Sequence, residues 1–227
     1  MPSTCYLLRL FLINVKLYVK EKLTNAKLYW VYDRTLSLEK DADGEKLRKL
    51  VDAGLIDILQ FRAKDITANE YEEWVLSLLS KIDRSKTIVL ANDYVESVKK
   101  LELDGVHVGQ NDMPVKLAKK MLGEKYIVGV TARSIEQAKD AEVNGADYIG
   151  AGTVFNTGTK LGLVAKGPEF IAEIIKETEI TVFPIGGIDL SKVPELVKFN
   201  IKRTAVASCL LADKDVLQMA REIRNLL

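Results

Sequence analysis

Residues 87–131 read TIVLANDYVESVKKLELDGVHVGQNDMPVKLAKKMLGEKYIVGVT, and this stretch decides the fold. It holds three short apolar runs rich in β-branched residues, which predict strands at 87–91, 105–108 and 126–131. Between the last two, residues 115–121 carry apolar side chains three and four positions apart, the spacing of an amphipathic helix. Leu122-Gly123 then supplies a typical helix stop. Strand and helix alternate, which favours a parallel sheet with crossover helices.

The same alternation extends in both directions along the chain. Five further apolar runs predict strands at 27–32, 56–61, 146–151, 181–185 and 203–208. Helical spacing recurs at 70–82, 135–143, 168–176 and 216–227. Eight strand-like runs, each followed by a helix-like one, predict an α/β fold, specifically a single TIM (β/α)8 barrel. We assign residues 27–227 to this barrel and residues 1–26 to an N-terminal extension.

The composition agrees with one compact domain. Of the 227 residues, 48% are hydrophobic, and 33 basic residues balance 32 acidic ones, so no overall charge points to nucleic acid or a membrane. Cys5 and Cys209 make no disulfide framework, and we expect a cytoplasmic protein. The apolar residues 5–19 are too short and interrupted to span a membrane, and lack the flanks of a secretory signal. We expect the extension to be a helix or strand that packs on the barrel, or to be partly disordered.

In TIM barrels the active site lies at the carboxyl ends of the strands. The second predicted strand ends in Gln60-Phe61-Arg62-Ala63-Lys64. Alternation along a strand points Gln60, Arg62 and Lys64 to the same side. Because a lone buried charge is costly, the two cations need either acidic partners or an anionic ligand.

Two carboxylates follow the next two strands. Asp93 comes after Asn92 at the end of the third strand, and Asp112 follows the fourth. They are either ion-pair partners of the basic cluster or ligands of a Mg²⁺ ion whose shell substrate phosphates complete. Thr131 places a hydroxyl at the end of the fifth strand. His107, the only histidine, lies within a strand, and we expect a packed, hydrogen-bonded core residue.

Two later segments offer groups for phosphate. Residues 153–167 form a long connection that contains Thr157-Gly158-Thr159-Lys160, two hydroxyls and an ammonium group, although solvated loops of this kind are common. Gly186-Gly187 and Ala207-Ser208 follow the seventh and eighth strands, where phosphate binds in many TIM barrels. Glycine lets the backbone approach an anion closely, so we expect a phosphate group there.

In combination, these motifs resemble those of thiamine-phosphate synthases. The resemblance runs in order from about Lys27 to the C-terminus and rests on Gln-x-Arg-x-Lys at 60–64, Asn92-Asp93, DGVHVGQ-x-D at 104–112, GADYIG-x-G at 145–152, Thr157-x-Thr159-Lys160 and Ile185-Gly186-Gly187-Ile188. It implies an enzyme that joins hydroxymethylpyrimidine pyrophosphate to hydroxyethylthiazole phosphate, releasing thiamine phosphate and pyrophosphate. It also implies Mg²⁺ as cofactor and a dissociative step, in which the bond to pyrophosphate breaks before the thiazole nitrogen attacks.

The resemblance further implies a role for each site residue. The pyrimidine pyrophosphate would be held by Gln60, Phe61, Arg62, Ala63, Lys64, Asn92, Thr131 and Lys160. Within this set, the implied catalytic residues are Arg62, Lys64, Thr131 and Lys160. The thiazole phosphate would be held by Thr157, Gly158, Thr159, Gly187, Ala207 and Ser208. The implied metal ligands are Asp93 and Asp112. The expected partners are these small molecules, and a homodimer is left open.

The sequence departs from the family pattern mainly on the thiazole side. Asn156 stands in place of a proline, Arg203-Thr204 in place of Gly-Val, and Ala207 in place of a larger aliphatic residue. Thr131 replaces the usual serine and keeps its hydroxyl. These changes affect the expected shape of the thiazole site more than the pyrophosphate site.

Two alternatives remain at this point. A thiazole tautomerase shares the barrel but relies on a histidine after the fifth strand, where this chain has Thr131-Ala132-Arg133-Ser134. The second alternative is a barrel that only binds thiamine precursors, which would not need a complete set of metal and pyrophosphate ligands.

Overall fold

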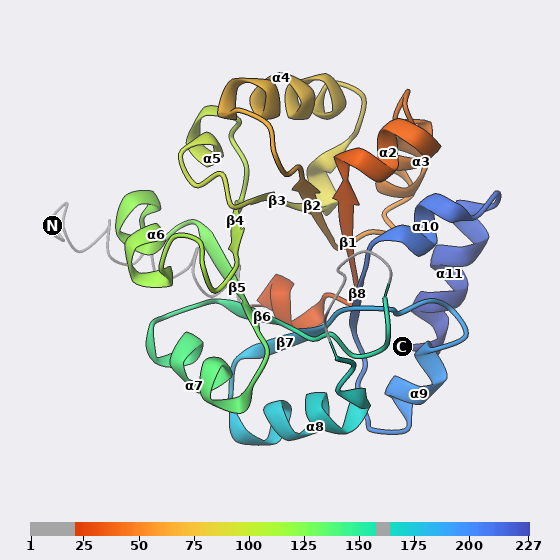
Figure 1. Ribbon diagram of the computed structural model, residues 1–227. Coiled ribbons are helices and arrows are strands. Elements are labelled where there is room, and N and C mark those ends of the chain that lie inside the picture. The colour runs from red at the N-terminus through yellow and green to blue at the C-terminus, as the bar shows by residue number, and fades with distance from the viewer. Residues whose placement is uncertain (1–20, 158–163) are drawn as a thin grey trace, which may run out of the picture.

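The computed structural model describes residues 21–157 and 164–227, which form a barrel of parallel strands surrounded by helices (Figure 1). The strands are β1 (Leu28–Asp33), β2 (Ile58–Arg62), β3 (Ile88–Asn92), β4 (Gly105–Val108), β5 (Ile127–Ala132), β6 (Tyr148–Ala151), β7 (Thr181–Pro184) and β8 (Thr204–Val206). They pair in the order β7-β6-β5-β4-β3-β2-β1-β8. At the seam, the Thr204 hydroxyl donates to the Pro184 carbonyl at 3.3 Å. The predicted α/β TIM barrel is confirmed.

The helices follow the strands in the order predicted. They are α2 (Arg34–Lys40), α3 (Glu45–Asp52), α4 (Ala68–Leu79), η1 (Arg84–Lys86), α5 (Ser97–Lys100), α6 (Val115–Leu122), α7 (Ile135–Val143), α8 (Gly167–Glu177), α9 (Val193–Val197), α10 (Ser208–Ala212) and α11 (Val216–Leu226). Helix α4 begins two residues before the predicted range of 70–82 because Thr67 and Glu70 form a capping box. It also ends earlier, at Leu79.

Alternation along the strands produces two separate apolar clusters. Outward-facing residues such as Trp30, Leu59 and Val106 pack under the helices in the larger cluster. Inward-facing residues such as Ile58 and Leu90 fill the barrel interior in the smaller one. Each side chain's place in its strand therefore decides whether it supports the helices or lines the interior.

Two glycines make room for rings inside the barrel. A Cβ on Gly129 would lie 2.0 Å from Cζ of Tyr148, its register partner in β6, so the Tyr148 ring occupies the space that any side chain there would need. A Cβ on Gly150 would lie 3.0 Å from Cε1 of His107. The two rings close the middle of the barrel, and the polar ends of the strands lie above them.

The described part of the N-terminal extension closes the other end of the barrel. Residues 21–25 are helical, and Figure 1 shows this helix behind the barrel opening. Leu23 is 1% exposed and belongs to the inner cluster, while Arg203 donates to its carbonyl at 3.2 Å. Residues 1–20 lie outside the described residues. Among residues 21–157 and 164–227, no helix is long and apolar enough to cross a membrane.

We predict that Gly129→Ala lowers the free energy of unfolding by about 1–3 kcal/mol, because the new methyl group overlaps the Tyr148 ring in a packed interior. Gly150→Ala is the matched control, since its closest approach is 1 Å longer, and we expect a smaller loss. Urea denaturation of both variants measures the difference. Equal stability of Gly129→Ala and the wild type would contradict the packing described here.

Candidate active site

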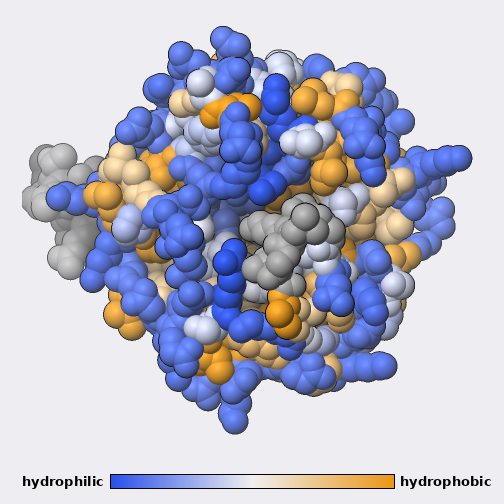
Figure 2. Space-filling view, viewed as in Figure 1, coloured by the Kyte–Doolittle hydropathy of each residue, from blue (hydrophilic) through white to orange (hydrophobic). Residues whose placement is uncertain are grey.

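A cavity of about 1220 Å³ opens at the carboxyl ends of the strands. Figure 2 views the same end of the molecule and shows hydrophilic side chains gathered near its centre. The structure brings together most of the predicted site residues in this cavity. Those lining it are Gln60, Arg62, Lys64, Asn92, Asp93, Asp112, Thr131, Thr157, Gly187, Ala207 and Ser208. Gly158, Thr159 and Lys160 lie outside the described residues.

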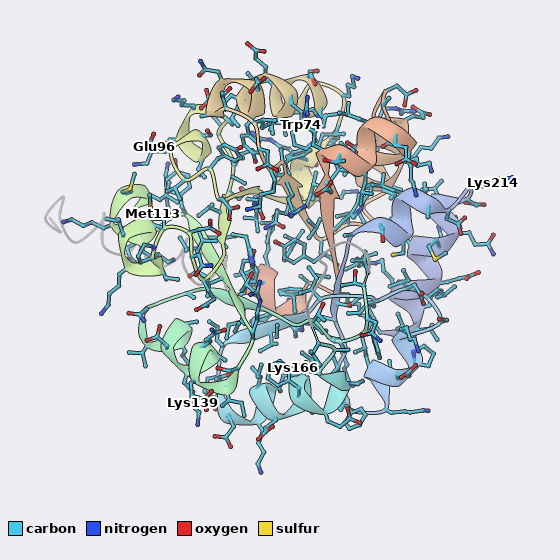
Figure 3. All side chains as sticks on the ribbon, in the orientation of Figure 1. Trp74, Glu96, Met113, Lys139, Lys166 and Lys214 are labelled. Carbon is cyan, nitrogen blue, oxygen red and sulfur yellow. The ribbon has the colours of Figure 1, made fainter. Side chains whose placement is uncertain are left out.

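Phe61 and Ala63 are the exceptions. Both side chains are buried in the outer apolar cluster, on the side of β2 away from the cavity. The Phe61 ring meets Trp74 of α4 edge-on, with centroids 5.6 Å apart, and Figure 3 shows Trp74 between α4 and the strands. Alternation turns their side chains outward, so only their backbone is available to a ligand in the cavity, and their place in the substrate set stays a prediction.

Each of the two cations at the end of β2 has an acidic partner. Arg62 forms an ion pair with Asp33, which is its register partner at the end of β1, and Lys64 forms one with Asp93. The sequence offered either acidic partners or an anionic ligand, and these ion pairs hold the cations in place while both line the cavity. Asp33 was missed, although its position directly after the first apolar run is the same signal that identified Asp93.

Asp93 and Asp112 lie side by side at the ends of β3 and β4. Burial raises the pKa of Asp93, and the neighbouring Asp112 carboxylate raises it further, against the opposing effect of Lys64. Asn92 Nδ2 donates to Asp93 at 2.6 Å, and the Gly109 amide donates to Asp112 at 2.8 Å. Two adjacent carboxylates of which one is reluctant to ionise form a donor set that suits a hard divalent cation.

No group of three or more metal-binding side chains occurs among residues 21–157 and 164–227. Asp93 and Asp112 are therefore too few to complete the coordination shell of a metal ion by themselves. Mg²⁺ commonly binds through one or two carboxylates together with water and substrate phosphate oxygens. The residues present therefore fit such an ion, and its remaining ligands would come from solvent and substrate.

The wall of the cavity formed after β7 and β8 is shaped by the backbone. Gly187 has φ of 64°, and a Cβ there would lie 2.4 Å from the Asn156 carbonyl oxygen. The Gly186 carbonyl accepts from the Phe155 amide at 3.0 Å, so the glycine turn after β7 holds the segment that leads to Thr157. Opposite it, Trp30 Nε1 donates to the Ala207 carbonyl at 3.1 Å and fixes the end of β8.

The cavity contains no activated nucleophile among the described residues. Burial raises the pKa of the Cys209 thiol to about 12, so the thiol stays protonated at neutral pH. His107 is hydrogen-bonded through both ring nitrogens, to Tyr148 and Thr131, each at 2.9 Å. The prediction of a hydrogen-bonded histidine is confirmed, but the ring also lines the cavity floor. Each ring nitrogen lies against a hydroxyl, so no carboxylate among residues 21–157 and 164–227 is seen to orient the ring as in a Ser-His-Asp arrangement.

The family of the chain follows from its match to a family model. The model of thiamine monophosphate synthases matches residues 28–210, most of the chain. The chain belongs to the thiamine-phosphate synthase family. This family consists of enzymes that are transferases, and the predicted resemblance is confirmed.

Known thiamine-phosphate synthases match the chain over nearly their whole length. The enzyme of Fusobacterium nucleatum is 32% identical over 204 residues, which cover 88% of this chain and 97% of that protein. The enzyme of Coprothermobacter proteolyticus is 33% identical over 212 residues, covering 92% and 97%. The solved structure of thiamine phosphate pyrophosphorylase from Pyrococcus furiosus superposes with a TM-score of 0.78 at 30% identity, covering 92% and 96%. A 3-hexulose-6-phosphate synthase, at 15% identity and a TM-score of 0.63, shares the fold alone.

We predict that Asp33→Asn lowers the free energy of unfolding by about 3 kcal/mol, because it leaves the guanidinium of Arg62 without its charged partner. The amide oxygen can still cap α2, where Asp33 accepts from the Leu36 amide at 3.2 Å. The control is the same change in an Arg62→Met background, where the loss should be small. A similar loss in both backgrounds would show that the ion pair is not the cause.

Proposed function

We propose that this protein condenses hydroxymethylpyrimidine pyrophosphate with hydroxyethylthiazole phosphate to give thiamine phosphate and pyrophosphate. The observation that carries the proposal is the state of Gln60. Its side chain is 3% exposed, and its Nε2 is buried at the cavity with no hydrogen-bond partner among the described residues. A buried donor without an acceptor costs about 1–3 kcal/mol. A pyrimidine ring nitrogen supplies such an acceptor, beside cations that suit the attached pyrophosphate.

Arg62 and Lys64 act on the leaving group. When the bond from the pyrimidine methylene carbon to pyrophosphate breaks, negative charge grows on the pyrophosphate oxygens. Arg62 is held by Asp33 and Lys64 by Asp93 before any ligand binds, so neither has to be reorganised during the reaction. Lys160 is proposed as a third cation from the segment outside the described residues. Thr131 contributes a hydroxyl from the end of β5.

We propose that Asp93 and Asp112 hold a Mg²⁺ ion. When bound, the ion would neutralise charge on the leaving pyrophosphate. The support is the pairing of the two carboxylates at the cavity wall and the raised pKa of Asp93, caused first by burial. A divalent cation offsets the desolvation and repulsion that raise this pKa.

The acceptor binds on the opposite side of the cavity. We propose that Gly187, Ala207 and Ser208, together with Thr157, Gly158 and Thr159, hold the phosphate of the thiazole. Strands β7 and β8 lie across the barrel from β3 and β4 in the strand order. A thiazole held there would face the pyrimidine methylene carbon, and its ring nitrogen would attack that carbon as pyrophosphate leaves. The attacking atom belongs to the substrate, so the protein needs no nucleophile of its own, in agreement with the protonated Cys209 thiol.

The two alternatives lose support. The loop after β5 carries Arg133 at the cavity, and the single histidine lies on a strand in the barrel interior, bonded to two hydroxyls. The relatives from Fusobacterium nucleatum and Coprothermobacter proteolyticus are thiamine-phosphate synthases. A non-catalytic barrel gives no reason for paired carboxylates and two pre-held cations in one cavity.

Compartment and assembly are part of the proposal. We propose that the enzyme acts in the cytoplasm. The support is that Cys209, the one cysteine within residues 21–157 and 164–227, is a free thiol, as is usual in a reducing compartment. A homodimer remains a prediction, and light scattering on the purified chain measures it directly.

The test of the proposed function is pyrophosphate release when both substrates and Mg²⁺ are supplied. We expect release to require all three components and to equal the thiamine phosphate formed. Rearrangement of the thiazole without pyrophosphate release would contradict the synthase and favour the tautomerase. Binding of both substrates without turnover would indicate a binding protein.

We predict that Asp93→Asn and Asp112→Asn each lower kcat by at least about 10², because loss of a metal ligand removes several kcal/mol of charge stabilisation. Added Mg²⁺ should restore part of the rate. Glu96→Gln serves as the control, since Glu96 is exposed and Figure 3 places it at the periphery, away from the barrel centre. Near-normal rates in both aspartate variants would refute their role as ligands.

A further inference from the structure

A chain of hydrogen bonds runs down the barrel interior from the cavity. Thr131 Oγ1 and His107 Nε2 lie 2.9 Å apart, His107 Nδ1 and the Tyr148 hydroxyl 2.9 Å apart, and the Tyr148 and Tyr29 hydroxyls 2.9 Å apart. The four residues come from β5, β4, β6 and β1. Gly129 and Gly150 give the Tyr148 and His107 rings their space. At one end of these hydrogen bonds Thr131 lines the cavity, and at the other end Tyr29, which also borders the cavity, is almost fully buried.

The tyrosine end of this series decides the direction of the hydrogen bonds, because the buried hydroxyl protons there need acceptors. Tyr29 and Tyr148 are 2% and 0% exposed, and Tyr148 is the one hydrogen-bond partner of the Tyr29 hydroxyl within the described parts of the chain. Burial raises the pKa of both tyrosines above the ordinary value, so both remain protonated at neutral pH. At the other end, Thr131 is partly exposed and lines the cavity.

The hydrogen bonds can run in two directions, and they are not equivalent. In one, Tyr29 donates to Tyr148, Tyr148 donates to Nδ1, and Nε2–H donates to Thr131, so every buried proton has an acceptor. In the other, Thr131 donates to Nε2 and Nδ1–H donates to Tyr148, which leaves the Tyr29 proton buried without an acceptor. If Tyr148 accepts from both Nδ1–H and the Tyr29 hydroxyl, its own hydroxyl proton is the one left without an acceptor. A doubly protonated imidazole strands one of these protons as well.

The first direction wins because a buried donor without an acceptor keeps its full cost of desolvation. We propose that Tyr148 is a positioning residue, which holds His107 as the neutral Nε2–H tautomer and thereby commits the Thr131 hydroxyl to donate into the cavity. With its lone pair engaged by Nε2–H, Thr131 turns its proton toward the ligand. In the opposite direction it would offer only lone pairs and would repel an anion.

The inference rests on the proposed function for the identity of the ligand. A hydroxyl committed as a donor suits an anionic oxygen, and the neighbouring cations Arg62 and Lys64 mark the pyrophosphate as its source. Tyr29 has a smaller part. Without it, the Tyr148 hydroxyl becomes the closed end of the chain and still has to donate to Nδ1.

His107 is the only histidine of the chain, so its tautomer can be read without assignment. Protein labelled with ¹⁵N-histidine, without a histidine tag, should show one imidazole with Nε2 protonated and Nδ1 unprotonated. Tyr29→Phe should keep this state. Tyr29→Phe/Tyr148→Phe should populate both tautomers, and it differs from its control by one hydroxyl. A protonated Nδ1 in the wild type, or an unchanged tautomer in the double variant, would overturn the proposal.

Binding of inorganic pyrophosphate with Mg²⁺ tests the consequence for Thr131. Relative to Tyr29→Phe, the double variant should bind roughly three- to tenfold more weakly. In a Thr131→Val background this difference should vanish, because the committed donor is gone. The same loss in both backgrounds would show a merely structural effect and refute the proposal. Failure of the wild type to bind pyrophosphate would refute the proposed function instead, and the tautomer measurement would still decide the inference.

Discussion

The packing of the Tyr148 ring against the bare backbone of Gly129 is the constraint on which the rest of the site depends. A barrel of eight strands has little room inside, and a ring fits at this level because the facing residue has no side chain. Tyr29, Phe183 and the other apolar residues of the inner cluster pack around the ring. Above it the interior becomes polar. The ring therefore fills the interior next to the cavity, which Tyr29 and His107 line.

The polar layer above this floor is organised before a ligand arrives. Arg62 and Lys64 each have an acidic partner from a neighbouring strand, and the glycine turn after β7 is braced by the segment from Phe155. Charges held in this way need little rearrangement when charge develops on a substrate. The strand order puts the cationic, carboxylate-bearing side and the ends of β7 and β8 on opposite walls of one cavity.

The fold and most of the site could be predicted from the sequence because both follow from local patterns. Strand phase placed Gln60, Arg62 and Lys64 on one side correctly, and the same rule turns the side chains of Phe61 and Ala63 away from the cavity. The family resemblance includes them because it covers the whole motif at 60–64, without distinguishing side chains that point into the barrel from those that point outward. The start of α4 was missed because its apolar spacing begins later than its capping box at Thr67.

Other features depend on contacts between distant strands. The hydrogen bonds among Tyr29, His107 and Tyr148 join β1, β4 and β6, and only the curvature of the closed barrel brings these side chains together. The sequence predicts that His107 is a core residue, and the motif around Tyr148 contributes to the family resemblance. Nothing in the sequence shows that the two side chains are in contact. The ion pair of Asp33 with Arg62 likewise depends on the register of β1 and β2, which apolar periodicity does not define to one residue.

A crystal structure with Mg²⁺, pyrophosphate and thiamine phosphate bound tests the two-sided cavity most directly. We predict that the metal and pyrophosphate lie beside Asp93, Asp112, Arg62 and Lys64, and that the phosphate of the thiazole lies at Gly187 and Ser208. Density for the pyrophosphate at the glycine turn after β7, with the thiazole phosphate beside Arg62, would contradict it.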